Sequence, residues 1–185
     1  MKTILLLLGI SVMSFSFGQE FLGIKVDGKL DSVIAKFKSK GFTLKITESK
    51  KDSSIMEGMA GNSHVEIYIS ATPVTFMVWK FSVLLPKESS WAALKASYDK
   101  YFGILKVKYG EPTKSFDFFI SPFSRGDGNE LQAVRLEKCI MSSYWTKLSV
   151  GIEISPYDQV KIAYENIINS ALANEERKEI NNKIF

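Results

Sequence analysis

Cysteine and histidine are almost absent from this chain of 185 residues, which contains one of each, Cys139 and His64. A single cysteine excludes an intrachain disulfide and a zinc site of clustered cysteines, and a single histidine excludes a multi-histidine metal site within one chain. We therefore expect no metal and no cofactor.

Proline and glycine are also infrequent: the sequence has five prolines and twelve glycines, and 45% of its residues are hydrophobic. That composition excludes a disordered chain and a collagen-like repeat, and favours a folded domain.

Arginine is also scarce. The formal net charge is +4 and comes from lysine, because the sequence holds only Arg125, Arg135 and Arg177. Bidentate recognition of phosphates and base edges relies on arginine. We therefore expect no nucleic-acid partner. The net positive charge is interpreted as one that keeps the protein soluble.

Residues 1–18 have the pattern of a secretory signal peptide. Lys2 provides the positive start, residues 4–15 are mainly apolar, and the small residues Ser16 and Gly18 predict cleavage before Gln19. No cysteine follows the apolar run, so we expect no lipoprotein anchor. No later segment is long and apolar enough to span a bilayer. The prediction is a soluble, exported protein, periplasmic or extracellular.

Two helices are predicted from apolar residues at helical spacing. The first carries its stripe over residues 30–37, with Asp27 as the expected N-cap and Gly41 just beyond its end. The second starts after Ser89 or Ser90 and ends at Gly110. Its stripe comprises Trp91, Leu94, Tyr98, Tyr101, Phe102 and Leu105.

Strands are predicted where apolar and polar residues alternate. The segments are 42–47, 55–60, 64–70, 74–85, 116–120, 133–140 and 145–154. The expected inward sets of the later segments are Phe116, Phe118 and Ile120, then Val134, Leu136 and Ile140, then Leu148, Val150, Ile152 and Ile154. Residues 158–172 fit either a strand or a helix. We favour a strand to about Glu165 and a partly helical tail after it.

This order of elements predicts an α+β fold. A single domain over 19–166 would contain two tandem repeats, about 24–85 and 89–166, each a helix followed by antiparallel strands. The helices would pack on one face of a mainly antiparallel sheet, and residues 167–185 would form a C-terminal tail.

Two segments carry a resemblance to known proteins. The run 21–28 with its helix leading to Lys40-Gly41-Phe42, and Trp91 with the later 108–112 (KYGEP), resemble small exported proteins of unknown function from Gram-negative bacteria. The order of elements is similar to the tandem helix-plus-sheet layout of beta-lactamase inhibitor proteins. That family binds an enzyme across a concave sheet and relies on disulfides, which this chain cannot form. No inhibitory residue can be matched, so the resemblance implies architecture and not activity.

Catalytic motifs are weak. His64 with Glu66 or Asp52 has no spacing typical of a serine hydrolase, and no Gly-x-Ser-x-Gly elbow is present. Cys139 fits a small packing residue, although an exposed thiol could link two chains. The segment 125–130 (RGDGNE) supplies only the start of a calcium loop and fits a turn. We assign no catalytic residue, but acids dispersed in sequence could still meet in a hydrolase site.

Surplus aromatic residues provide the remaining functional signal. Phe119 and Phe123 lie off the expected inward alternation, and Tyr68 and Trp145 lie on polar sides. If one sheet face is open, they could project there. The candidate binding residues are Tyr68, Trp145, Lys147, His64 and Glu66.

The leading hypothesis from the sequence is an exported, non-catalytic domain that binds a protein or glycan through an open sheet face. The alternatives are an exported hydrolase with dispersed acidic residues and a structural envelope protein.

Overall fold

The computed structural model describes residues 19–45 and 51–184, so the predicted signal peptide and part of the predicted 42–47 strand lie outside the described residues. The helices are α1 (Leu30–Ser39), α2 (Trp91–Tyr109), α3 (Glu130–Arg135) and α4 (Ile167–Ile184), with a short 3₁₀ turn at Thr146–Leu148. The strands are β1 (Glu20–Phe21), β2 (Ile24–Lys25), β3 (Thr43–Leu44), β4 (Ser53–Ala60), β5 (Ser63–Ala71), β6 (Val78–Leu84), β7 (Lys114–Phe119), β8 (Cys139–Trp145), β9 (Val150–Ser155) and β10 (Gln159–Glu165).

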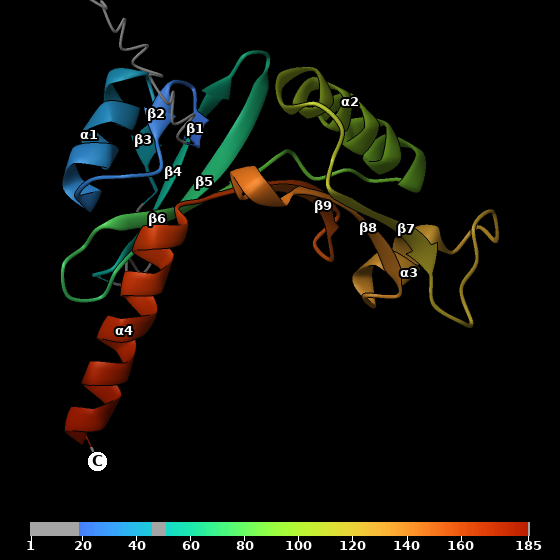
Figure 1. The fold of residues 1–185 in the computed structure, drawn as a ribbon. Coiled ribbons are helices and arrows are strands. Elements are labelled where there is room, and N and C mark those ends of the chain that lie inside the picture. Colours follow the sequence, from blue (N-terminus) through green and yellow to red (C-terminus); the bar gives the residue numbers. More distant parts are fainter. Residues whose placement is uncertain (1–18, 46–50, 185) are drawn as a thin grey trace, which may run out of the picture.

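Eight of the strands form one antiparallel sheet in the order β3-β4-β5-β6-β10-β9-β8-β7. Strands from the first half of the chain occupy one side of the sheet and strands from the second half the other, and β6 and β10 pair where the halves meet. The predicted α+β class with a mainly antiparallel sheet is confirmed. The separate pair β1-β2 lies beside α1 (Figure 1).

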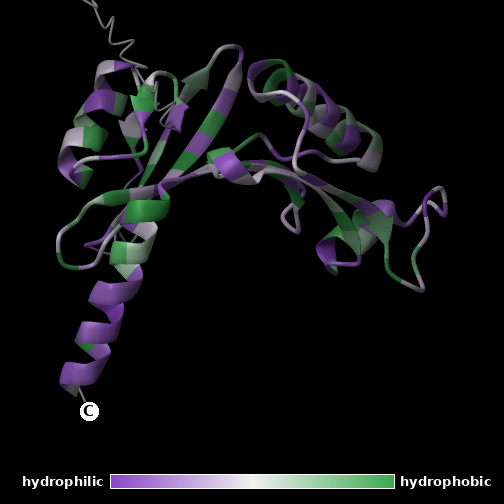
Figure 2. Ribbon diagram, in the orientation of Figure 1, coloured by the Kyte–Doolittle hydropathy of each residue, from purple (hydrophilic) through white to green (hydrophobic). Residues whose placement is uncertain are grey.

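Helices α1 and α2 lie on the same side of the sheet (Figure 1). Strand residues that face them are buried, and their neighbours in sequence are more exposed, which is the alternation expected when one face is covered. Figure 2 shows the matching alternation of hydrophobic and hydrophilic residues along β5. The core centres on Phe37 of α1, which has no exposed surface and contacts the rings of Phe42 and Phe81 at centroid distances of 5.5 and 5.3 Å. Apolar burial on this face is therefore the main contribution to stability.

The predicted helix ends are mostly confirmed. Ser90 Oγ accepts a hydrogen bond of 3.2 Å from the backbone N–H of Ala93 and caps α2. Gly110, with φ of +80°, ends α2. Asp27 is not the cap of α1: the N-cap is Lys29, and the Asp27 carboxylate accepts instead from Gly28 N–H and the Asn169 side chain.

The predicted strand over 133–140 is wrong. Its first residues belong to α3, and β8 starts only at Cys139. Glu137, with φ of +55°, ends the helix in the left-handed region. The N–H groups of Glu137 and Lys138 then donate to the carbonyls of Val134 and Ala133, a helix-ending pattern that usually contains glycine. The expected inward residue Leu136 is 54% exposed as a result.

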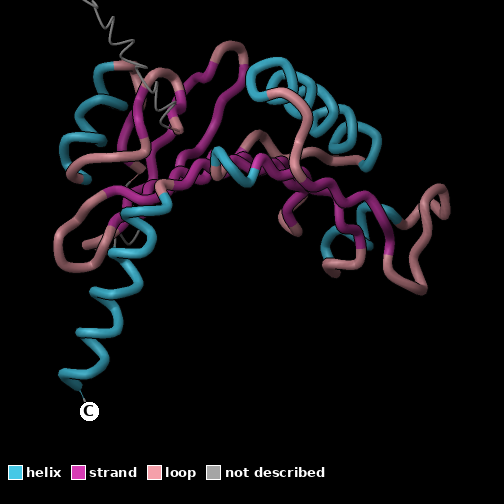
Figure 3. The backbone as a smooth tube through the Cα atoms, viewed as in Figure 1, coloured by secondary structure: helices cyan, strands magenta, loops and turns pink. Residues whose placement is uncertain are grey.

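The C-terminal segment follows the favoured prediction, a strand and then a helix. β10 ends at Glu165, and Asn166 caps α4 by accepting from the N–H of Asn169 at 3.1 Å. α4 contacts β6 and then extends away from the sheet on the side opposite α1 and α2 (Figures 1 and 3). No helix in the described ranges is long and apolar enough to cross a membrane.

Candidate functional site

The sheet face opposite α1 and α2, here called the open face, presents rows of side chains that run across the strands. Directly paired residues in antiparallel strands share a face. One row, read from β4 to β7, is Ile55, Tyr68, Ser82, Ala163, Gly151, Tyr144 and Lys114. The next row is Thr43, Glu57, Glu66, Leu84, Lys161, Glu153, Ser142 and Phe116.

Small residues form the middle of the open face. Ser82, Ala163 and Gly151 lie side by side on the central strands, between Tyr68 and Tyr144. A Cβ on Gly151 would lie 2.8 Å from the Tyr144 ring, so this position requires glycine for the ring to lie over it. A hollow of about 350 Å³ opens beside these residues and is lined by Lys80, Tyr144, Glu153, Lys161, Ala163 and Glu165, among others. Gly151 itself is buried under the Tyr144 ring, and Ser82 and Ala163 beside it are partly exposed.

Ion pairs surround this hollow. Lys161 Nζ lies 2.5 Å from Glu153, and Lys80 Nζ lies 3.7 Å from Glu165. Each pair joins directly opposite positions on neighbouring strands, and each side chain is about one third exposed. The Tyr144 hydroxyl donates to Glu153 at 3.3 Å. The charges at the centre of the open face are balanced and reachable from solvent.

A third ionic cluster lies toward β3. Glu57 and Glu66 are directly opposite each other, and Lys45 reaches both, at 4.0 and 2.5 Å. Like charges at opposite positions destabilise a sheet, so Lys45 offsets their repulsion. The hydrogen bond to Glu66 raises the pKa of Lys45, since it favours the charged ammonium.

Three of the five predicted binding residues lie on the open face. Tyr68 is 39% exposed, His64 is exposed, and Glu66 is partly exposed in its ion pair with Lys45. All three come from β5, where polar and apolar residues alternate in the sequence and the polar ones face away from the core. The three side chains thus lie on the same face of the sheet, and their binding role remains a prediction.

Trp145 is not on the open face, and that prediction is wrong. It is 2% exposed, lies on the helix-covered side against Phe102 and Tyr109, and donates from Nε1 to the carbonyl of Gly110 at 2.8 Å. The reason is the turn after β8. Trp145 ends β8 and pairs with buried Val150, so the two side chains lie on the same, covered face of the sheet. In a single continuous strand over 145–154, residues 145 and 150 would instead point to opposite faces.

Lys147 is exposed but lies in the 3₁₀ turn at Thr146–Leu148 and not on a strand. The structure therefore does not bring Lys147 together with Tyr68 on the sheet.

The inward set predicted for 116–120 has the wrong phase. Phe116 and Phe118 are 43% and 47% exposed and lie on the open face, and Ile120 is exposed as well. Phe119 is instead partly buried on the covered side, where its ring lies 5.8 Å from that of Trp91. Phe123 is likewise partly buried against the core. The sequence signal was ambiguous because both faces of β7 carry phenylalanine.

The remaining motifs have structural roles. Cys139 is 5% exposed, and burial raises the pKa of its thiol to about 11, so it packs as a small apolar residue and is a poor nucleophile. In the 125–130 segment, backbone N–H groups of Ser124 and Asn129 bind the Asp127 carboxylate and lower its pKa, and Gly126 N–H binds Glu130. The carboxylates of this loop thus accept hydrogen bonds from the backbone of the same loop, as is common in turns.

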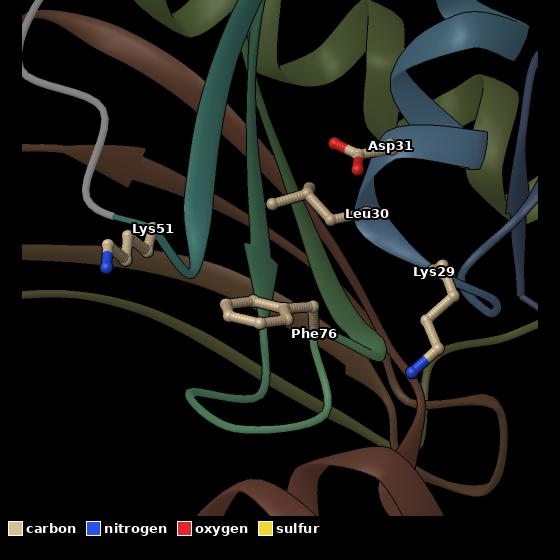
Figure 4. A pocket seen from close by; sticks show the side chains of 5 residues that line it. All are labelled: Lys29, Leu30, Asp31, Lys51 and Phe76. Carbon is tan, nitrogen blue, oxygen red and sulfur yellow. The ribbon is translucent and has the colours of Figure 1, made fainter.

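Another hollow of about 340 Å³ lies beside the start of α1 (Figure 4). Lys29, Asp31 and Lys51 line it with Leu30 and Phe76, but the charged groups point in different directions, and Lys29 Nζ donates to the carbonyl of Thr75 at 2.6 Å. No charged groups converge there. Within the described part of the chain, no three His, Cys, Asp or Glu residues are grouped to hold a metal ion.

Comparison with protein-family models, with curated proteins and with solved structures found no match to this chain.

Proposed function

We propose that this chain is an exported, non-catalytic binding protein that engages a protein partner across the open face. The supporting observation is the difference between the two faces of the sheet. The face toward α1 and α2 holds the apolar core, and the other carries exposed Tyr68, exposed His64 and three ion-paired clusters. A structural role would not require this uncovered polar and aromatic surface.

The chemistry of the open face suits a protein partner. Tyrosine contributes a large contact area with little loss of side-chain entropy and is enriched among residues that dominate binding energy. Ser82 and Ala163 are small and partly exposed, so a partner side chain could lie beside them, between Tyr68 and Tyr144. The flanking lysine–glutamate pairs would form the polar rim that such interfaces have.

Export rests on the sequence of residues 1–18, and the likeness to beta-lactamase inhibitor proteins is a proposal about architecture. In this eight-stranded sheet α1 and α2 cover one face, and the opposite face is covered by α4 only near β6, which is compatible with binding of an enzyme or another folded protein, as that resemblance implies.

A hydrolase is the second candidate, because one observation favours it. Glu57 and Glu66 are directly opposite, which places their Cβ atoms about 5 Å apart, and retaining glycoside hydrolases use two carboxyl groups at a spacing of about 5 Å. However, Lys45 Nζ lies 2.5 Å from the Glu66 carboxylate, and this ion pair favours the ionised carboxylate. A general acid must carry a proton, so the ion pair opposes that role for Glu66. We therefore place binding first.

The test compares co-purification of the processed protein from its source cells with that of two variants. Tyr68→Ala alters the open face, and Val107→Ala alters an apolar residue of α2 that is 91% exposed on the opposite side. We expect one protein to be enriched with the wild type and with Val107→Ala, and to fall at least tenfold with Tyr68→Ala. Equal recovery with both variants would refute the proposal. Turnover of a glycoside that Glu66→Gln abolishes would favour the hydrolase.

A further inference from the structure

β7 forms one edge of the sheet. It is the last strand in the sheet order, and among the described residues it pairs only with β8. Every residue from Lys114 to Phe118 is exposed. An uncovered edge strand is a template for a further strand, and proteins usually protect such edges.

The side chains of β7 are unusually apolar for an edge. Phe116 and Phe118 project on the open face with roughly half of their surface exposed. On the other side, Arg125 forms an ion pair with Asp117 and lies 5.8 Å from the Phe119 ring centroid, so the loop after β7 packs against the covered side and leaves the open side free.

We infer that β7 pairs with β7 of a second copy of this chain, in an antiparallel arrangement with Phe116 opposite Phe116 of the partner copy. In this register Lys114 lies opposite Phe118, and Ser115 lies opposite Asp117. The first pair brings a cation to an aromatic ring, and the second brings a hydroxyl donor to a carboxylate. In this register no like charges of Lys114–Phe118 lie opposite each other, and Asp117 is also neutralised by Arg125 of its own chain.

Backbone geometry agrees with this register. Ile120 N–H donates to the carbonyl of Lys138 on the β8 side at 2.7 Å, so by alternation the backbone groups of Phe118 and Phe116 also face β8. The backbone groups of Ser115 and Asp117 then face the free edge. In the proposed dimer, Ser115 of one copy forms backbone hydrogen bonds with Asp117 of the other. Phe116 then occupies a non-hydrogen-bonded position, where opposite side chains come closest.

Moving the two-fold axis from Phe116 to Asp117, a slip of two residues between the strands, is less favourable, because it places Asp117 opposite Asp117 of the second copy, and opposite like charges destabilise a sheet. The inferred register also keeps the faces aligned, so the open faces of the two copies would form one continuous surface. Pairing along one short strand buries little area, which predicts a weak dimer that depends on protein concentration.

Single-cysteine variants test the register. Phe116→Cys should form a disulfide-linked dimer under mild oxidation, since its thiol faces its own copy across the axis. Phe118→Cys should not form this disulfide, because the same position of the second copy lies about 13 Å away along the strands. Buried Cys139 serves as the internal control in both. Cross-linking of Phe118→Cys as fast as Phe116→Cys, or of neither, would overturn the inference, and efficient cross-linking of Asp117→Cys alone would overturn the register.

Sedimentation equilibrium tests the dimer without cross-links. The wild type should show a reversible monomer–dimer equilibrium. Phe116→Lys, which opposes two ammonium groups across the axis, should weaken it at least tenfold, whereas Ile104→Lys, the same kind of change at an exposed apolar residue of α2, should not. Unchanged melting of Phe116→Lys would exclude misfolding. A wild type that is monomeric throughout would refute the inference, and this result would not affect the proposed partner binding, which rests on Tyr68.

Discussion

Glu176 is predicted to fix the C-terminal helix to the sheet. It lies in the middle of α4, is 6% exposed, and accepts hydrogen bonds from the N–H of Val74 at 2.7 Å, the N–H of Thr75 at 3.2 Å and the hydroxyl of Thr75 at 2.5 Å. These donors belong to the turn between β5 and β6, which is distant in sequence. The carboxylate is therefore the principal polar link between α4 and this turn.

Replacing Glu176 with alanine removes these bonds and leaves their donors without a partner. A hydrogen bond to a charged group contributes about 1.5–3 kcal/mol, but Val74 is 53% exposed and water can replace part of the loss. We expect Glu176→Ala to lower the free energy of unfolding by about 2 kcal/mol, or the Tm by about 6 °C for a domain of this size. Glu175→Ala, at the exposed neighbouring position, should change it by less than about 0.5 kcal/mol.

The pH dependence of stability provides a second reading of the same site. Burial alone would raise the pKa of Glu176, but hydrogen bonds from Thr75 and Val74 outweigh it and hold the pKa below its ordinary value. Its stabilisation is therefore fully present above the ordinary pKa and is lost as the pH falls through the lower, folded-state value. In thermal melts the difference between wild type and Glu176→Gln should be full at about pH 6 and shrink toward about pH 3. Equal Tm values for Glu176→Ala and Glu175→Ala at about pH 6 would refute the reasoning.

Four further predictions concern other elements. Trp145→Ala should lower the free energy of unfolding by about 3–5 kcal/mol in denaturant titrations, whereas Lys147→Ala should change it by under about 0.5 kcal/mol; similar values would contradict the burial of the indole. The Cys139 thiol, with its raised pKa, should react with a thiol reagent at about pH 8 only after denaturant is added, and rapid labelling of the folded protein would show that it is accessible. Glu137→Gly should stabilise the protein by about 0.5–1 kcal/mol, because glycine adopts the positive φ without strain, and a loss of stability would contradict this conformation. Gly151→Val should destabilise it by at least about 1 kcal/mol, because the side chain collides with the Tyr144 ring, and a neutral effect would mean that the ring lies elsewhere.

The fold class could be predicted because its main signals are local. Apolar spacing in the first two helices, Ser90 at the start of α2, Gly110 at its end, and the alternation in β5 all act within a few residues. The structure follows these signals closely. The same alternation indicates which side chains of β5 face away from the core, Tyr68 among them.

The errors arise where alternation crosses a turn or where a helix end lacks its usual residue. The 3₁₀ turn after Trp145 reverses which side of the sheet the following residues face, and nothing in the local composition marks it. Helix α3 ends on Glu137 in a conformation that favours glycine, so the usual stop signal is missing. Glu176 could not be recognised either, because its partners at residues 74 and 75 become neighbours only in the folded chain.

The most direct test of the central claim is photo-cross-linking in the source cells. A photoreactive amino acid at position 68 would lie on the proposed contact surface, and one at position 107 would lie on α2, exposed on the opposite side. We expect a cross-linked species of one discrete mass from position 68 and none from position 107. The same species from both positions, or from position 107 alone, would contradict the assignment of the open face as the binding surface.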